Sequence, residues 1–259
     1  MYAEERQDAI AAMVISNGRA SVAELAKAYD VTTETVRRDL AVLDKAGVVH
    51  RVHGGAVPVR ALHLVEPGVG ERESTRADYK DAIAAAATEF FPLSGASVLL
   101  DAGTTTARIA GLMPTDRELV VVTNSVPIAA RLAAFPSVSL QLLGGRVRGI
   151  TQAAVGEQAL RVLDSMRVDI AFIGTNAISA RHGLSTPDSE EAAVKRAMVR
   201  CANYVVVAAD STKVGREDFV SFAPISSVDT LITDSEISDA DRTMLTDEGV
   251  EVVIAEDPS

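Results

Sequence analysis

The sequence predicts two domains: a small helical domain ending in a β-hairpin, and an α/β effector domain with a mostly parallel sheet flanked by helices. Residues 1–57 contain three stretches of helical periodicity, followed by a run of alternating apolar and polar residues with two glycines. From residue 80 to residue 259, short apolar strands alternate with helices, the pattern of a parallel sheet covered by helices. A chain of 259 residues has room for both cores.

The small domain begins with a helix predicted over residues 4–14. Ser21 and Glu24 have capping-box spacing and open a second helix. A third helix follows, with Thr32 or Thr33 as its N-cap. This order of elements predicts a winged helix-turn-helix, in which the last of these helices enters the major groove of DNA.

The third helix has two distinct faces. Val36, Leu40 and Leu43 are spaced to form one apolar stripe that packs inward. The remaining surface of the helix carries the predicted DNA contacts, namely Thr33, Glu34, Thr35, Arg37 and Arg38. We expect Arg38 to approach base edges and Arg37 to approach phosphate, because arginine bonds both.

The predicted wing is an alternating run over residues 48–52, followed by Gly54 and Gly55. Its candidate DNA contacts are His50, Arg51 and His53. A helix followed by a basic hairpin favours a nucleic-acid-binding module.

Two observations oppose DNA binding. Arg37 and Arg38 could be an ordinary solvated face, paired with Glu34 and Asp39. The net charge is -11, whereas DNA-binding domains usually have a basic excess. However, residues 1–60 hold 8 Lys and Arg and 8 Asp and Glu, so the remaining 17 basic and 28 acidic residues carry the whole deficit. The acidity therefore belongs to the second domain.

Residues 58–79 contain Pro67, Gly68 and Gly70 without sustained periodicity, which predicts a linker. Beyond it we expect helices at residues 81–91, around Ile109 and Leu112, and at 127–134. The expected strands are residues 98–100, 119–122, 140–143, 170–173, 204–208, 230–232 and 252–254.

Polar residues follow five of these strands. Ligands of open α/β sheets bind beyond the carboxyl ends of the strands, so these loops predict one pocket. The candidate ligand-binding residues there are Asp101, Gly103, Thr104, Thr105, Thr106, Thr123, Asn124, Ser125, Gly144, Gly145, Arg146, Gly174, Thr175, Asn176, Asp210 and Lys213.

Of the five loops, the one after the first strand gives the strongest indication of a ligand site. Residues 101–106 lead into a helix, where backbone N–H groups and threonine hydroxyls can hold a phosphate. The loop differs from the Walker and dinucleotide motifs, which argues against a nucleoside triphosphate or NAD. A plain strand-to-helix turn remains the alternative. Residues 174–176 could likewise be simple turn chemistry, and Arg146 and Arg148 could pair with acids or a subunit surface.

Composition excludes several classes of protein. One cysteine, Cys201, excludes an intramolecular disulfide framework. The four histidines show no metal-ligand spacing with it, so we expect no metal site. The sequence has no apolar segment of membrane-spanning length, and its charged N-terminus is unlike a signal peptide. We expect a soluble, cytoplasmic protein.

Ordered motifs along the chain resemble the DeoR/GlpR family of bacterial transcriptional regulators. They are VTTETVRRDL (31–40), RVHGGAV (51–57), LLDAGTTT (99–106), VVTNS (121–125), LLGGRVR (142–148) and ADSTK (209–213). The resemblance implies a winged helix-turn-helix and a sugar-phosphate-sensing domain related in fold to ribose-5-phosphate isomerase. It also implies a repressor relieved by its ligand, a homo-oligomeric dimer or tetramer that binds double-stranded operator DNA, and no cofactor.

The resemblance further implies roles for single residues. Residues 103–106 and Lys80 would bind phosphate; Asp101, Asn124, Asp210 and Lys213 would meet hydroxyl or carbonyl oxygens. A surface lysine at a helix start is the alternative for Lys80. The segments GGRVRG (144–149) and AAVGE (153–157) look most like the fructose-operon branch, which favours fructose 1-phosphate.

Two other functions remain open at this stage. Asp210 and Lys213 could perform acid-base work in a sugar-phosphate isomerase. However, the stretch DIAFIGTNAI (169–178) has Thr175 and Asn176 where such isomerases place carboxylates. Alternatively, the second domain could serve only for oligomerisation.

Overall fold

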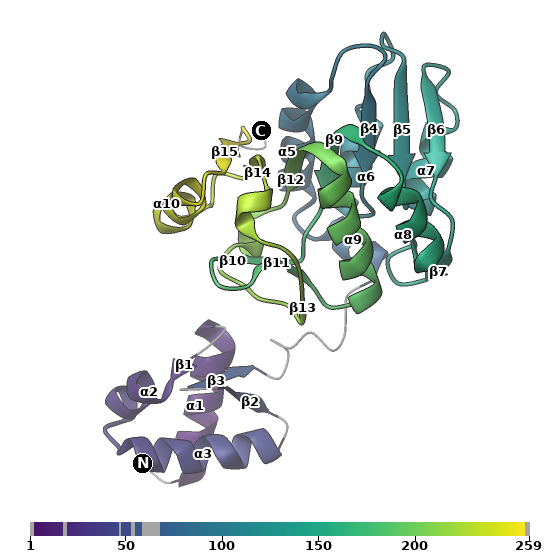
Figure 1. The fold of residues 1–259 in the computed structure, drawn as a ribbon. Coiled ribbons are helices and arrows are strands. Elements are labelled where there is room, and N and C mark those ends of the chain that lie inside the picture. Colours follow the sequence, from purple (N-terminus) through teal and green to yellow (C-terminus); the bar gives the residue numbers. More distant parts are fainter. Residues whose placement is uncertain (1–2, 18–19, 47, 53–54, 59–67, 257–259) are drawn as a thin grey trace. The chain divides into compact units, whose positions relative to one another are not determined.

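The chain forms two compact units in a computed structural model that describes residues 3–17, 20–46, 48–52, 55–58 and 68–256 (Figure 1). The first unit is Met1–Val65 and the second is Glu66–Ser259. Each unit has its own hydrophobic core.

The first unit contains three helices and a small antiparallel sheet of order β1-β3-β2. Its elements are α1 (Ala3–Asn17), β1 (Ala20–Ser21), α2 (Val22–Tyr29), α3 (Thr33–Lys45), β2 (Val49–Val52) and β3 (Gly55–Pro58). Ser21 and Glu24 form the predicted capping box, and Thr32 is the N-cap of α3. The predicted helix-turn-helix with a β-hairpin is confirmed.

The apolar stripe of α3 is buried against the other two helices. Val36, Leu40 and Leu43 lie in one core with Ile10 of α1 and Leu25 of α2. Burying each such side chain stabilises the fold by about 1.5–3 kcal/mol. Because this stripe faces inward, the opposite side of α3 is left to solvent.

Asp39 is a buried acid in the same helix. It accepts hydrogen bonds from Arg6 (2.6 Å) and Gln7 (2.9 Å) of α1. Burial acts to raise the pKa of Asp39, but these hydrogen bonds outweigh it and the pKa lies below its ordinary value. Asp39 therefore holds α3 to α1 and is not the partner of Arg37 or Arg38.

The second unit is built on a parallel sheet of seven strands, ordered β15-β14-β12-β9-β4-β5-β6. These strands are β4 (Ser97–Leu100), β5 (Leu119–Thr123), β6 (Val138–Leu142), β9 (Val168–Ile173), β12 (Ala202–Ala208), β14 (Thr230–Thr233) and β15 (Glu251–Ile254). All seven expected strands are present, which confirms the α/β class.

Helices cover both faces of the sheet (Figure 1). One core contains residues of α5 (Ala77–Ala87), α6 (Thr104–Gly111) and α7 (Val126–Leu132). The other contains residues of α8 (Glu157–Asp164), α9 (Ser189–Cys201) and α10 (Asp239–Asp247). Alternate residues of β9 enter the two cores, with Phe172 in the first and Ala171 and Ile173 in the second. The result is a three-layer α/β/α sandwich.

Smaller elements decorate this sandwich, and the sequence did not predict them. They are the hairpin β7 (Arg146–Arg148) and β8 (Ala153–Val155), the antiparallel sheet of β10 (Ala177–Ser179), β11 (Gly183–Thr186) and β13 (Val220–Ala223), the helix α4 (Val69–Ser74), and the 3-10 turns η2 (Thr88–Phe90), η3 (Ser211–Lys213) and η4 (Ile225–Ser227).

The second unit begins earlier than expected. The predicted linker ran over residues 58–79, but α4 and the start of α5 lie within that range. Arg108 of α6 bonds the carboxylate and the carbonyl oxygen of Glu73, which fixes α4 to the sandwich. Helices of six and eleven residues with a turn between them give too little periodicity to be recognised, so the boundary was placed too late. Residues 59–67 lie outside the described part of the chain.

Candidate DNA-binding surface and effector site

The predicted DNA-binding residues lie on the outer side of α3. Arg38 and Arg37 are exposed at 81% and 55% of their side-chain surface, and Thr33 is also exposed. Glu34 lies 3.4 Å from Arg37 and 3.9 Å from Arg38. Exposed pairs of this kind contribute only about 0–1 kcal/mol, so DNA phosphate can displace Glu34 at little cost.

The other predicted DNA contacts are Thr35 and the residues of the predicted wing. Thr35 is half-buried and contacts the N-cap hydroxyl of Thr32, so it supports the start of α3. β2 contains the backbone of His50 and Arg51, but their side chains lie outside the described part of the structure, as does all of His53.

In the second unit, hydrogen bonds tie the ends of three neighbouring strands together. Asp101, after β4, accepts from the backbone N–H of Gly174 after β9, at 3.0 Å. Asn124, after β5, accepts from Ala102 N at 3.0 Å and donates to Ala154 O at 3.2 Å. Three of the five loops predicted to share a pocket therefore meet at one edge. Asn124 is occupied in holding them there, which was not its predicted role.

The N-terminus of α6 lies at this edge. Its N-cap is Gly103, which provides no side-chain hydrogen bond to the first turn. Thr105 is half-buried, whereas the hydroxyl of Thr106 donates to Gly103 O at 3.1 Å. An eight-residue helix with an uncapped first turn presents backbone N–H groups and the positive end of its dipole to an anion.

Three cationic groups interact with one another, and one of them, Arg108, bonds the first turn of α6 and pairs with Glu73 and Asp81. Lys80 of α5 is buried, contrary to the surface alternative, and it interacts electrostatically with Asp210, Lys213 and Arg108. Arg108 donates to Thr104 O at 3.1 Å, which ties the group to the first turn of α6. Burial, with repulsion from the two neighbouring cations, lowers the pKa of Lys80 to about 8. These cations together with α6 suit a doubly charged phosphate.

Arg76 was missed by sequence reasoning. It lies in the turn between α4 and α5, with positive φ of 52°, and stands 3.1 Å from Asp234 and 2.8 Å from Glu236. It also lies 3.6 Å from Asp210, which is buried. The partners of Arg76 lie more than 130 positions away in sequence, so no local pattern could reveal them.

Several predicted ligand-binding residues make hydrogen bonds that stabilise the fold. Thr123 donates to Leu100 O, and Ser125 caps α7. Thr175 donates to Ala177 O, which is the turn chemistry named as the alternative, whereas Asn176 accepts from Thr186 of β11.

The predicted residues of the 144–146 loop are exposed. Gly144 and Gly145 are exposed, and a Cβ on Gly145 would lie 2.4 Å from Val155 O, so this glycine allows the hairpin backbones to approach. Arg146 is 62% exposed and pairs with Glu190. Arg148 pairs with Glu191 of α9 at 2.5 Å. Both arginines therefore bond acids, as the alternative stated.

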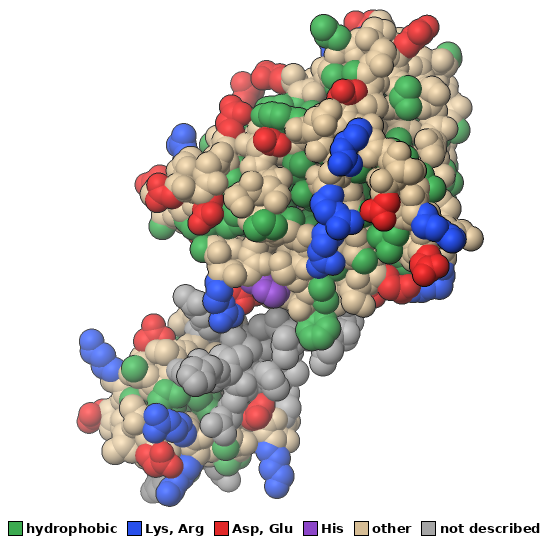
Figure 2. Space-filling view, in the orientation of Figure 1, with side chains coloured by type: hydrophobic (Ala, Val, Ile, Leu, Met, Phe, Trp, Pro, Cys, Tyr) green, Lys and Arg blue, Asp and Glu red, His purple; other side chains and the backbone are tan. Residues whose placement is uncertain are grey.

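Helix α9 carries the second residue that sequence reasoning missed. Figure 2 shows a row of Lys and Arg side chains over this helix, and its exposed residues include Arg196 and Arg200. Lys195 lies on the same helix but is only 5% exposed, and it contacts the Asp101 carboxylate. A lysine within an apolar helical pattern is the one signal that could have identified it.

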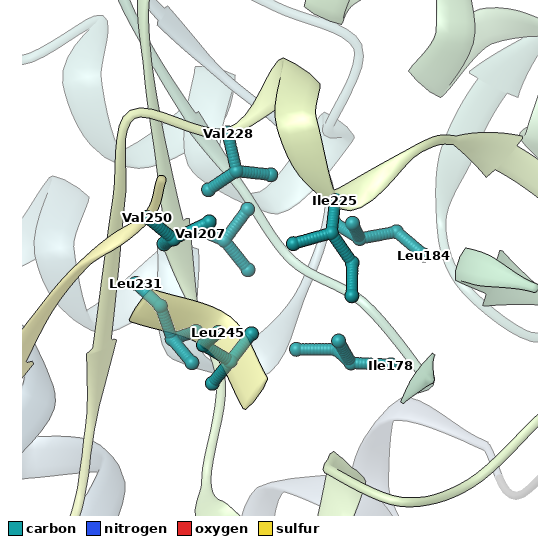
Figure 3. Close-up of a pocket in the computed structure, with 8 residues that line it drawn as sticks. All are labelled: Ile178, Leu184, Val207, Ile225, Val228, Leu231, Leu245 and Val250. Atoms are coloured by element: carbon teal, nitrogen blue, oxygen red, sulfur yellow. The ribbon is translucent and has the colours of Figure 1, made fainter. Parts of the chain in front are cut away.

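The apolar cavity in Figure 3 is not part of this cluster. Eight aliphatic side chains line it, among them Ile178, Leu231 and Leu245, and its volume is about 10 Å³. A cavity of that size holds one water at most and offers no polar partner to a ligand. It is a packing gap between α10 and the sheet.

No helix within the described ranges has both the length and the apolar character needed to cross a membrane.

Comparison with known proteins agrees with this division of the chain. Residues 6–60 match the DeoR-like helix-turn-helix domain, and residues 75–235 match the DeoR C terminal sensor domain. The HTH-type transcriptional regulator GlpR of Haloferax volcanii is 37% identical over 98% of both chains. The uncharacterized HTH-type transcriptional regulator FruR of Bacillus subtilis is 34% identical over 91% of this chain and 93% of that protein.

Among solved structures, ribose 5-phosphate isomerase A of Methanocaldococcus jannaschii aligns with 54% of this chain and 55% of its own. Its TM-score is 0.40 and its sequence identity 18%. Both domain matches and the full-length similarity lead to one conclusion: the chain belongs to the DeoR family of sugar-responsive, DNA-binding transcriptional regulators.

Proposed function

We propose that the protein is a homo-oligomeric repressor of a sugar-utilisation operon and that a phosphorylated sugar releases it from its operator. The observation that carries the proposal is the electrostatic grouping of Lys80, Lys213 and Arg108, of which Arg108 also bonds Thr104 O in the uncapped first turn of α6. Within the same chain, α3 presents Arg37 and Arg38 to solvent. We favour fructose 1-phosphate as the effector, an assignment supported by motif resemblance and by the name of the FruR relative.

A binding role is favoured over catalysis at this site. Proton abstraction beside a carbonyl needs a base within reach of the substrate. Thr175 and Asn176, at the end of β9, are not bases, and both side chains bond groups of the fold, with Thr175 on Ala177 O and Asn176 on Thr186 of β11. Asp210 faces Arg76 at 3.6 Å and caps η3, so its carboxylate already bonds within the fold.

The route from effector to DNA begins at Lys80. Its ammonium donates to Thr75 O at 2.6 Å and to Arg72 O, the second of which belongs to α4. A phosphate at the N-terminus of α6 would compete with these carbonyls for the ammonium. Because α4 is the first described element of the second unit, we infer that this competition loosens α4. A ligand shifts such an equilibrium only by binding one arrangement more tightly.

A thermal-shift screen tests the proposed function. Saturation by a bound sugar phosphate at about 100 times its Kd should raise the Tm by roughly 5–10 °C, because only the folded state binds it. Unphosphorylated fructose is the matched control and should leave the Tm unchanged. If fructose 1-phosphate, ribose 5-phosphate and related esters all fail to stabilise the chain, the second domain serves assembly only. Turnover of any of them would make it an enzyme.

Sugar-phosphate affinity should also weaken as the pH rises through about 8. The cause is Lys80, whose pKa of about 8 lies below the ordinary lysine value of 10.5, so its ammonium loses its proton as the pH passes about 8. Lys80 also affects stability. Between pH 8 and pH 10.5 the unfolded chain binds more protons than the folded one, so the free energy of unfolding rises with pH. Calorimetric titration from pH 6.5 to 9.5 measures the change in sugar-phosphate affinity. The Lys80→Arg variant should bind sugar phosphate with an affinity that does not change over this pH range. If its affinity falls with pH as the wild type's does, the assignment of the effect to Lys80 is wrong.

A further inference from the structure

Lys195 places a buried ammonium group at the carboxyl ends of β4 and β9. Its Nζ contacts Asp101 Oδ2 and donates to Gly174 O at 2.9 Å. The same carboxylate oxygen accepts from Gly174 N at 3.0 Å. Lys195 is 5% exposed and Asp101 1% exposed. Helix α9 therefore delivers a fixed positive charge to the edge of the sheet where the polar loops meet.

Stability does not explain this pair. Removing two charges from water is costly, and replacing a buried ion pair with apolar groups is often neutral or stabilising. Val194 and Met198, on either side of Lys195 in α9, are fully buried in the core, so an apolar residue would fit the surroundings. Burial also raises the pKa of Asp101, against the influence of the Lys195 ammonium. A charged pair kept at such a position needs another reason.

Both groups keep unused hydrogen-bonding capacity. An ammonium has three N–H donors, and Lys195 uses two. Asp101 receives both of its bonds on Oδ2, and Oδ1 has no hydrogen-bond partner among the described residues. Gly174 is half-buried beside the carboxylate, where even an added Cβ would stand 3.6 Å from Oδ2. One N–H donor of Lys195 and the acceptor Oδ1 of Asp101 thus remain beside Gly174, which has no side chain.

We infer that Lys195 and Asp101 recognise the sugar end of the effector while the N-terminus of α6 holds its phosphate. This inference rests on the proposed function. Asp101 lies three residues before Thr104, a distance of at most about 11 Å, so one phosphorylated sugar can span both places. The free ammonium N–H donates to the carbonyl or ring oxygen, and Asp101 Oδ1 accepts from a neighbouring hydroxyl. The ligand class is accordingly a hydroxylated sugar phosphate, distinguished from phosphate alone.

The test compares the full-length wild type with Asp101→Asn/Lys195→Met, which removes both charges at nearly constant volume. The asparagine oxygen can still accept from Gly174 N. Lys195→Met alone should lower the Tm by about 10 °C, because it leaves a buried carboxylate without its cation. The double variant should regain most of that loss. Calorimetry then measures fructose 1-phosphate and inorganic phosphate binding to each protein.

We expect the double variant to bind inorganic phosphate as the wild type does and fructose 1-phosphate about 100-fold more weakly, since two charge-assisted hydrogen bonds are lost. Wild-type affinity for fructose 1-phosphate in the double variant would show a purely structural pair and overturn the inference. Equal loss of both ligands would overturn it too, because the pair would then shape the phosphate site. A wild type that binds no sugar phosphate would overturn the proposed function itself.

Asp101→Asn alone is the second variant, used if the double variant does not fold. It keeps the volume and the acceptor for Gly174, and it should bind fructose 1-phosphate about 10-fold more weakly with phosphate binding unchanged. Unchanged fructose 1-phosphate affinity would again overturn the inference.

Discussion

Arg38→Ala should abolish specific operator binding and leave sugar-phosphate affinity unchanged. Arg38 is 81% exposed on the outer face of α3, and its pairing with Glu34 at 3.9 Å is too weak to hold the fold. An arginine that bonds a base edge contributes about 1–3 kcal/mol of discrimination. The oligomer that we propose would present two recognition helices and lose this discrimination twice, so the operator Kd should rise by about 30-fold to 10⁴-fold. Fluorescence anisotropy with a duplex selected from a random library measures the loss.

Lys45→Ala is the matched control for this result. Lys45 is exposed in the last turn of the same helix, so its removal lowers the positive charge equally without touching the predicted contact face. We expect a small, sequence-independent loss that shrinks as salt increases, as for any screened phosphate contact. If the two variants lose operator affinity equally, α3 contributes only bulk charge and the recognition role of Arg38 is wrong.

Lys213→Ala should have the opposite effect, with operator binding retained and effector response lost. Lys213 ends η3 beside Lys80, and its half-buried ammonium has no ion-pair partner among the described residues. A charged hydrogen bond to phosphate is worth about 1.5–3 kcal/mol, so sugar-phosphate affinity should fall by about 10-fold to 150-fold. The measurement is calorimetric titration of the variant with fructose 1-phosphate, followed by operator titration.

The control for Lys213 is Arg200→Ala on the outer side of α9. Arg200 is 65% exposed and faces Asp164 at 3.3 Å, away from the polar strand ends. It should leave both ligand affinities at wild-type values. Lys213→Ala protein that folds normally and still responds to the same sugar-phosphate concentration would exclude Lys213 from the site. Loss of operator binding as well would contradict the separation of the two sites.

The helix-turn-helix was predictable because its determinants are local. Val36, Leu40 and Leu43 set the buried face of α3, and the capping box at Ser21 is complete within four residues. The strands of the sheet were predictable for a similar reason, since each is a short apolar run between turns. The meeting of three polar loops at one edge follows from the parallel topology alone.

The partners of individual polar side chains were not predictable. Asn124 follows β5 as a ligand-binding residue would, yet both ends of its amide bond the backbone of neighbouring loops. Lys195 and Asp101 are separated by 94 positions, and only the packing of α9 against the sheet joins them. Arg76 meets Asp234 in the same way. Sequence patterns identify residues that can bind a ligand, whereas tertiary contacts decide which remain free to do so.

The central claim is that sugar phosphate and operator compete through one chain. The most direct measurement is the anisotropy of a labelled operator duplex bound to the full-length protein during titration with fructose 1-phosphate. The account predicts a fall to the value of free duplex. It also predicts that operator weakens sugar-phosphate affinity by the same factor, because coupling between two sites is reciprocal. Unchanged anisotropy at a concentration that saturates the protein in calorimetry would contradict the account.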